Sequence, residues 1–287
     1  MKWRGQRQSG NVEDRRGTTV RRAGIGGGLG VIAILLIGSL LGVDPRVLLG
    51  GVEVVNSIAP PVEETRPYQE TDAEAETRQF LAVVLADTED VWAAIFQDMG
   101  GRYRQPRLVL FSGAVQSACG FAEAAMGPFY CPPDERVFVD MSFFDELRER
   151  MGAGGDFAQA YVLAHEIGHH VQNLLGTSGK VHELQQRHGG AAAKQLSVRL
   201  ELQADCYAGV WARHADRMRG VIEPGDVEEA LGAASAVGDD RLQRQAQGYV
   251  VPDSFTHGSS AQRMRWFRIG LDSGSLAACD TFAADSV

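Results

Sequence analysis

A His-Glu-x-x-His sequence at residues 165–169 combines residue types and spacing suited to metal chemistry. Apolar residues recur around it at helical spacing, so the motif is predicted to lie on a helix. His165 and His169 are four residues apart and share one helix face, where both imidazoles can bind one cation. Glu166 lies about 100° round the helix, beside the position of a metal-bound water. The pattern predicts a catalytic zinc site with Glu166 as general base.

A catalytic zinc ion usually takes three protein ligands and a water, so the site requires a third ligand elsewhere. The extended metzincin motif is absent, because Gln172 and Leu175 stand where its glycine and third histidine would be. Glu201 and Asp205 lie on a later predicted helix and, four residues apart, face the same way. One carboxylate can bind the metal while the other accepts the ring N–H of a ligating histidine. Glu201 is the stronger candidate for the ligand, and Asp205 is its rival.

Four segments resemble a bacterial family described as "putative neutral zinc metallopeptidase". They are HEIGHHVQ at 165–172, ELQADC at 201–206, GDDRLQ at 238–243 and HGSSAQR at 257–263. Members of that family combine a short basic N-terminus, one membrane span and a zincin-like domain, so the resemblance covers nearly the whole chain. The HExxH and ExxxD pair also resembles the wider gluzincin group.

The resemblance implies a complete set of site residues and Zn²⁺ as the cofactor. His165, His169 and Glu201 would bind the metal, Asp205 would orient a ligating histidine, and Glu166 would act as the base. His257 is a further candidate, because thermolysin-type gluzincins use a later histidine to stabilise the oxyanion. The alternative for His257 is that residues 256–260 are only the capped start of a helix.

The remaining patterns predict an α+β fold: a mostly helical zincin-like domain with a small β-sheet, preceded by one transmembrane helix. A core helix begins near Thr71 and ends before Gly100. Short β-rich runs at 107–111 and 136–140 predict two strands. Further helices are expected at about 143–151, 156–175, 191–218, 224–247 and 260–271.

Residues 25–43 carry no charge and are long enough to cross a bilayer as a helix of roughly 28 Å. Seven basic residues precede them, which predicts a cytoplasmic N-terminus by the positive-inside rule. The chain is therefore divided into a basic cytoplasmic segment, a transmembrane helix, a linker and a metallopeptidase domain, at 1–24, 25–43, 44–70 and 71–287. A cleaved signal peptide is the alternative, although no A-x-A-like site follows the run.

Composition limits the class of protein and its location. The 287 residues are 44% hydrophobic and 23% charged, as in ordinary globular proteins. The net charge is −9 although the N-terminus is basic, so the acidic body argues against a nucleic-acid partner. The predicted topology places the domain in the periplasm or outside the cell, where disulfides persist. Among three possible pairings, Cys119–Cys131 and Cys206–Cys279 are favoured.

The predicted function is a membrane-anchored zinc endopeptidase that cleaves proteins or peptides outside the cytoplasm. The alternative is a zinc-stabilised envelope binding or chaperone-like protein without turnover, against which the presence of Glu166 argues. An aminopeptidase is disfavoured, because the chain lacks a G-x-M-E-N type motif. The sequence does not indicate an oligomeric state or a particular substrate.

Overall fold

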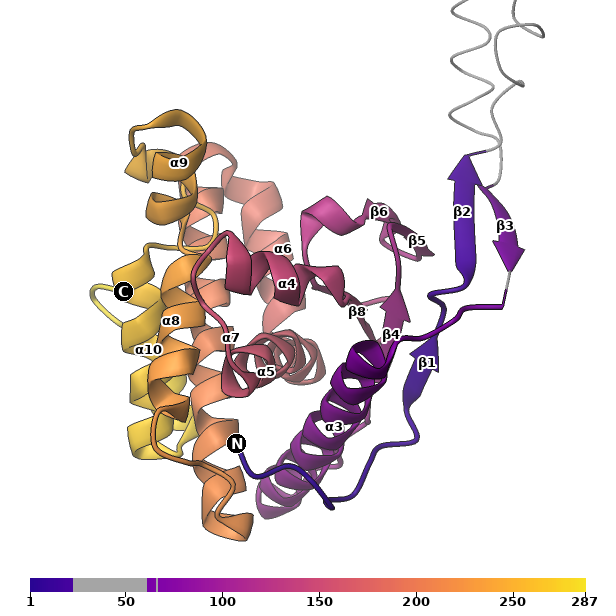
Figure 1. The fold of residues 1–287 in the computed structure, drawn as a ribbon. Coiled ribbons are helices and arrows are strands. Elements are labelled where there is room, and N and C mark those ends of the chain that lie inside the picture. The colour runs from indigo at the N-terminus through magenta and orange to yellow at the C-terminus, as the bar shows by residue number, and fades with distance from the viewer. Residues whose placement is uncertain (23–60, 66) are drawn as a thin grey trace, which may run out of the picture.

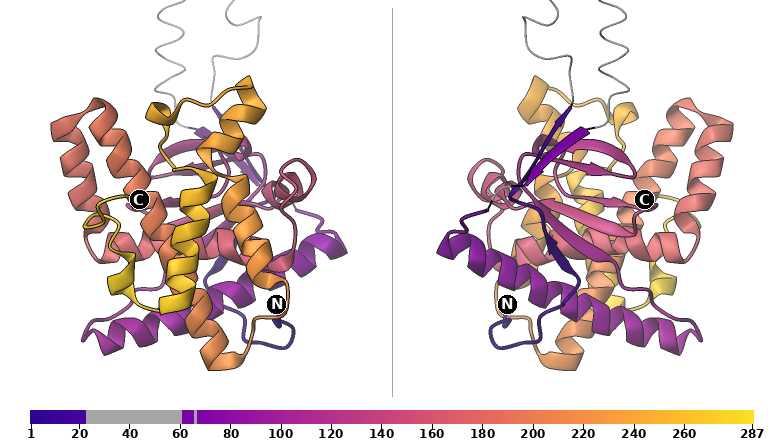
Figure 2. Two further views of the ribbon diagram at one scale, coloured as in Figure 1. Left: turned by 90° about the vertical axis from the view of Figure 1, so that its left-hand side faces the viewer. Right: turned by 90° about the vertical axis from the view of Figure 1, so that its right-hand side faces the viewer.

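The computed structural model describes residues 1–22, 61–65 and 67–287. Over these residues the fold is α+β and mostly helical, as predicted, with helices packed against one face of a small sheet (Figure 1). Two views from opposite sides show α3 (Asp72–Asp98) running across the other elements on one side of the molecule and the C-terminal helices on the other (Figure 2).

The main sheet has four strands in the order β1, β4, β8 and β7. Their bounds are Val12–Asp14, Arg107–Phe111, Arg136–Asp140 and Phe129–Cys131. The strands β1, β4 and β8 are parallel, whereas β7 is antiparallel to β8. Because β7 is the last strand in this order, it forms one edge of the sheet. A hairpin of β5 (Ala114–Ser117) and β6 (Gly120–Glu123) contributes apolar side chains to the second face. Both faces of β4 are therefore buried.

A local capping signal marks the start of α3. Thr71 caps α3 in a capping box with Glu74, as its position before an acidic first turn suggests. The other helices are α4 (Ser142–Glu149), α5 (Asp156–Leu174), α6 (Thr177–His188), α7 (Gly190–Arg219), α8 (Asp226–Ala236), α9 (Asp239–Gln247) and α10 (Ser260–Ser273). Single 3₁₀ turns lie at Ala124–Met126, Pro252–Ser254 and Leu276–Cys279.

Two predicted helical segments differ in the structure. The stretch expected as one helix at 224–247 is broken at Gly238, where a Cβ atom would lie 2.4 Å from the backbone nitrogen of Ser260. The polar segment that forms α6 was not predicted as a helix, and of its residues only Val181 is buried. Hydrophobic periodicity within a segment predicts neither the break at Gly238 nor a helix with a single buried residue.

Glycines bring three helices into close contact. A Cβ atom on Gly270 of α10 would lie 1.9 Å from the carbonyl oxygen of Cys206 on α7. A Cβ on Gly209 of α7 would lie 2.1 Å from the carbonyl oxygen of Phe267. At the crossing of α5 and α7, Gly168 lies against the backbone of Ala204 in the same way. The helices that carry the predicted site are thus packed backbone to backbone.

Residues 1–22 pack with the rest of the domain. The segment crosses α3, where the backbone nitrogen of Ser9 donates to Ala82, and then enters the sheet as β1 (Figure 1). Next, β2 (Thr18–Arg22) pairs with β3 (Pro61–Thr65), which lies inside the predicted linker. The two ends that flank residues 23–60 are therefore neighbours.

The fold class predicted with a leading transmembrane helix is wrong. Among the described residues no helix is both long and apolar enough to cross a bilayer. The predicted span at 25–43 lies outside those residues, as do the predicted boundaries at 24 and 43. The prediction treated the basic N-terminus as a free flank, whereas β2 within that segment pairs with β3.

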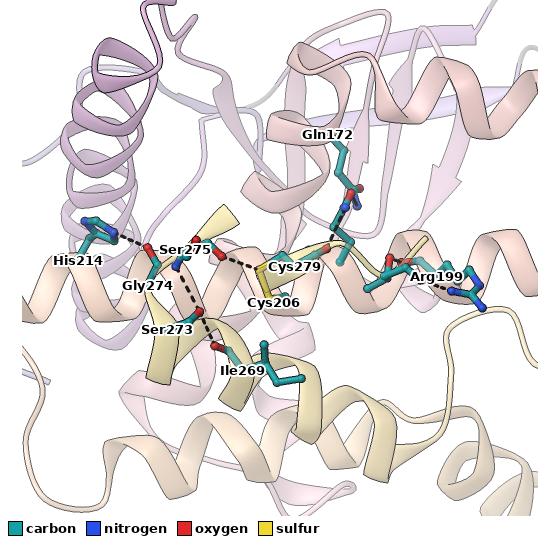
Figure 3. The surroundings of a disulfide bond; sticks show 11 residues. Gln172, Arg199, Cys206, His214, Ile269, Ser273, Gly274, Ser275 and Cys279 are labelled. Atoms are coloured by element: carbon teal, nitrogen blue, oxygen red, sulfur yellow. Dashed lines mark hydrogen bonds between the residues drawn. A yellow bond between two sulfur atoms is a disulfide. The ribbon is translucent and has the colours of Figure 1, made fainter. Parts of the chain in front are cut away.

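Both predicted disulfides are formed. Cys119–Cys131 joins the turn of the β5–β6 hairpin to the end of β7, and Cys206–Cys279 joins α7 to the C-terminal turn (Figure 3). Together they use all four cysteines of the chain.

Candidate metal centre

The structure brings together His165, His169 and Glu201, whose ligand atoms all lie within 4.8 Å of one another. The two histidines are on one face of α5, and Glu201 is on α7, which crosses α5. The Nε2 atoms of His165 and His169 lie 3.2 and 3.4 Å from the two oxygens of the Glu201 carboxylate. Ligand atoms of a tetrahedral zinc site are separated by roughly 3.3 Å, so this donor set fits zinc.

The other nitrogen of each imidazole also has a partner. His165 Nδ1 lies 2.8 Å from Asp205 Oδ1, and His169 Nδ1 lies 2.9 Å from Gln172 Oε1. Each histidine therefore donates from Nδ1, so Nε2 is the atom directed at Glu201 and would be the metal ligand once its own proton is displaced. Asp205 occupies the position that the sequence predicted for an orienting carboxylate.

A buried network holds Asp205 in this orientation. The guanidinium of Arg263 donates to both oxygens of Asp205, at 2.8 Å from Nε and 2.9 Å from Nη2. Tyr161 donates its hydroxyl hydrogen to Oδ1 at 2.5 Å. Asp205 is fully buried and Arg263 is 4% exposed, so their charges compensate one another away from solvent. Both Asp205 oxygens are thus engaged by this network.

The charges of the site set its protonation in the absence of a metal. Burial disfavours a charged imidazole at His165, but the carboxylates of Asp205 and Glu201 outweigh it and raise the pKa of His165 to about 9. The pKa of His169 is raised by Glu201 against the same opposing effect of burial. Burial would raise the pKa of Glu201, yet the two histidines hold it well below its usual range.

Glu166 lies next to these ligands along a cleft of about 620 Å³. It is 8% exposed and lines the cleft together with His165, His169 and Glu201. Apolar side chains form other parts of the wall, among them Phe129 on β7 and Val162 on α5. The arrangement places a carboxylate beside the metal-ligand cluster in an open cavity large enough for several residues of a peptide.

His257 lines the same cleft from the loop before α10. Its side chain is 53% exposed, and Asp239 holds it by accepting from the His257 backbone nitrogen at 2.7 Å and contacting Nδ1 at 3.2 Å. The hydrogen bond to Asp239 raises the pKa of His257 against the opposing effect of burial. The helix-cap alternative is realised by Ser259, which caps α10. The side chain of His257 takes no part in that cap and lines the cleft.

Several residues of the site were not recognised in the sequence. Arg263 and Asp239 lie within the motifs that carry the family resemblance, but their spacing alone assigns them no partner. Gln172 was noted only as a departure from the metzincin pattern. Arg263 and Asp239 reach Asp205 and His257 from distant parts of the chain, so local spacing does not identify them. Gln172 lies only three residues after His169, but the contacts that fix its amide come from α7.

The fold and site together define a class of HExxH proteins in which a glutamate from a second helix completes the candidate metal centre. Within this class, the chain belongs to the family described as "Putative neutral zinc metallopeptidase", whose model matches residues 1–282.

The chain is similar over most of its length to relatives of unassigned function. It is 49% identical to "Uncharacterized protein YpfJ" of Escherichia coli strain K12, covering 98% of this chain and 99% of the relative. It is 42% identical to "Uncharacterized protein Rv2575" of Mycobacterium tuberculosis, covering 85% of each. No solved structure matches the chain significantly.

Proposed function

We propose that the protein is a zinc-dependent endopeptidase of the gluzincin type, with His165, His169 and Glu201 as the metal ligands. The observation that carries this proposal is the position of Glu166, in the cleft and next to a donor set that fits zinc. A structural zinc site is closed by four protein ligands and needs no carboxylate base beside it. The non-catalytic alternative leaves Glu166 without a role.

The residues of the cleft have distinct tasks in peptide hydrolysis. When bound, zinc supplies Lewis acidity, which activates water and polarises a carbonyl group. Glu166 accepts a proton from the attacking water and returns it to the leaving amine. His257 donates to the developing oxyanion, and Asp239 supports this role by favouring the protonated imidazole. Asp205 and Gln172 keep the two ligating imidazoles in the required tautomer.

The edge strand β7 supports an endopeptidase over an aminopeptidase. Phe129 and Tyr130 of β7 line the cleft, and in the described part of the chain β7 pairs only with β8. An extended peptide can add to such an edge through backbone hydrogen bonds on both sides of the scissile bond. The substrate class that follows is an extended segment of a protein or peptide.

A location outside the cytoplasm remains part of the proposal. The two disulfides support it, because such bonds persist in oxidising compartments and are rare in the bacterial cytoplasm. Alkylation of intact cells with a thiol reagent that reacts with free cysteines tests it. All four cysteines should resist labelling until the protein is reduced, and rapid labelling without reduction would contradict this location.

The proposed activity is tested by Glu166→Gln. The substitution keeps the side-chain volume and the three ligands but removes the base, so it should retain one zinc per chain and lose at least about a hundredfold in rate. Zinc is measured by elemental analysis and cleavage with a casein substrate or a peptide library. Glu183→Gln, an exposed change on α6, is the control. A wild-type protein that binds zinc but cleaves nothing, or normal cleavage by Glu166→Gln, would overturn the proposal.

The ligand assignment is tested by comparing Glu201→Ala with Asp205→Asn. Removing Glu201 takes away one of three protein ligands, so zinc should be lost on dialysis. Asp205→Asn should retain zinc with about 10- to 100-fold weaker affinity or activity, because only the orientation of His165 is disturbed. Circular dichroism checks that both variants fold. The reverse order of zinc loss would make Asp205 the ligand.

A further inference from the structure

A fully buried glutamine, Gln172, contacts the second ligating histidine on the side away from Glu201. Its Oε1 lies 2.9 Å from His169 Nδ1, while its Nε2 donates to the backbone carbonyl of Leu200 at 2.7 Å. Nε2 also donates to Oε1 of Gln203 at 3.1 Å. Every polar atom of the Gln172 amide is therefore used, away from solvent.

These contacts determine which atoms carry hydrogen. A backbone carbonyl can only accept, so the Gln172 atom that faces Leu200 must be the amide nitrogen. The atom that faces His169 is then the amide oxygen, which accepts a hydrogen from Nδ1. Nε2 of His169 is consequently the ring atom that faces Glu201 and that would bind a metal once its own proton is displaced.

The same argument extends one residue further. Gln203 Nε2 donates to the backbone carbonyl of Cys279 at 3.0 Å, so its Oε1 is the atom that accepts from Gln172. Gln203 is on α7 and is 6% exposed. The orientation of the His169 ring therefore depends on two backbone carbonyl groups. One belongs to Leu200 on α7, and the other belongs to Cys279 in the C-terminal tail at residues 276–287.

The C-terminal tail is held beside α7 by covalent and polar contacts. Cys279 forms the disulfide with Cys206, and the buried Thr281 donates its hydroxyl hydrogen to the carbonyl of Arg199 at 2.7 Å. Arg199 in turn donates to the carbonyl of Ala284 at 3.0 Å. Figure 3 shows Gln172 and Arg199 on either side of the tail that carries Cys279. The carbonyl that anchors Gln203 is thus fixed by the disulfide.

We propose that Gln172 and Gln203, here termed the amide relay, are positioning residues for His169 and couple it to the Cys206–Cys279 disulfide. The inference rests on the proposed function only in taking His169 as a metal ligand. Without the amide relay, the His169 ring can rotate or place its hydrogen on Nε2, and both changes weaken metal binding. Breaking the disulfide loosens the anchor at Cys279 and acts on the same histidine from a distance.

The first experiment measures zinc affinity by competition with a chromophoric chelator. Gln172→Ala should bind zinc about 10- to 100-fold more weakly than the wild-type protein. Gln159→Ala, on the same helix but outside the amide relay, should bind as the wild type does. Absorption spectra of the cobalt-loaded proteins provide a second readout, in which only Gln172→Ala should change the ligand-field bands, because the coordination of His169 changes.

The second experiment tests the coupling to the disulfide with a double-mutant cycle. Replacing Cys206 and Cys279 with serine removes the bond without adding thiols that bind zinc. This pair should weaken zinc binding several-fold in the wild-type background and have little further effect in Gln172→Ala, because the relay is already broken there. If the serine pair does not fold, Gln203→Ala takes its place in the cycle.

The outcomes separate this inference from the proposed function. A wild-type protein that binds no zinc would overturn both. Zinc binding by the wild type with equal affinity in Gln172→Ala would overturn the amide relay alone, whatever the cleavage activity. Independent, multiplicative effects of Gln172→Ala and the serine pair would show that the disulfide does not act through the relay.

Discussion

At the scale of single residues, the candidate metal centre is a cluster of opposite charges that the metal would enter by displacing protons. In the absence of metal, the pKa of His165 is raised to about 9 and that of His169 is also raised, because carboxylates face both rings. Zinc binds only the neutral imidazole. Protons therefore compete with zinc at neutral pH, and they do so increasingly as the pH falls.

Zinc binding at pH 7 should consequently release at least one proton per site. The sign follows from the raised pKa: His165 is protonated below about 9, so the apparent affinity should increase as the pH rises to that value. Calorimetry in two buffers of different ionisation enthalpy measures the number of protons released. A zinc affinity that is constant between pH 6 and 9 would contradict the charged cluster.

Residue spacing predicted the part of the site that one helix determines. His165 and His169 share a face because a helix repeats every 3.6 residues, and Glu201 and Asp205 follow the same rule on a second helix. The partners of Asp205 and Gln172 come from Arg263, Gln203 and the tail at Cys279, all distant in sequence. No periodicity within either helix encodes such contacts.

At the scale of helices, the site depends on how closely α7 approaches α10 and α5. A side chain larger than hydrogen at Gly270 would overlap the backbone of Cys206, one residue beyond Asp205 and at the position of the disulfide. Backbone cannot move aside as a flexible side chain can. The distance between α7 and α10 is therefore set by Gly209 and Gly270 together.

Gly270→Ala should destabilise the protein by about 3 kcal/mol or more, because the added methyl group forces the two helices apart. Gly232→Ala on α8 is the matched control, since no atom lies within 4 Å of its added Cβ. That control should be neutral or stabilising by up to about 1 kcal/mol. Chemical denaturation of both variants provides the measurement, and equal stabilities would show that the crossing tolerates a wider separation.

Helices with apolar faces and the two central strands were predictable because their patterns are local. The segments at 107–111 and 136–140 form β4 and β8 with the expected bounds, and the helix expected to begin near Thr71 begins at Asp72. The strand β1 was missed, because Val12–Asp14 contains two acidic residues and pairs with residues almost a hundred positions later. Its position depends on a distant edge of the sheet rather than on its own hydrophobicity.

At the scale of the whole molecule, the N-terminal segment determines how the chain is divided into parts. A buried carboxylate on α3, Glu89, is 2% exposed and is bound by three side chains of that segment. Ser9 and Asn11 donate to its Oε1 at 2.5 and 2.7 Å, and Arg7 donates to Oε2 at 3.1 Å. A buried charge requires such partners, so residues 7–11 and α3 stabilise one another.

Asn11→Ala should lower the free energy of unfolding by about 1.5–3 kcal/mol, because it removes a hydrogen bond to a buried charged group. Gln8→Ala, at an exposed neighbouring position, should change it by less than about 0.5 kcal/mol. Hydrogen exchange of the full chain provides a second measurement. The amide of Ser9, which donates to Ala82, should exchange as slowly as those of α3 in the wild type and faster in Asn11→Ala. Fast exchange at Ser9 in the wild type would instead agree with the sequence-based prediction of a separate basic segment.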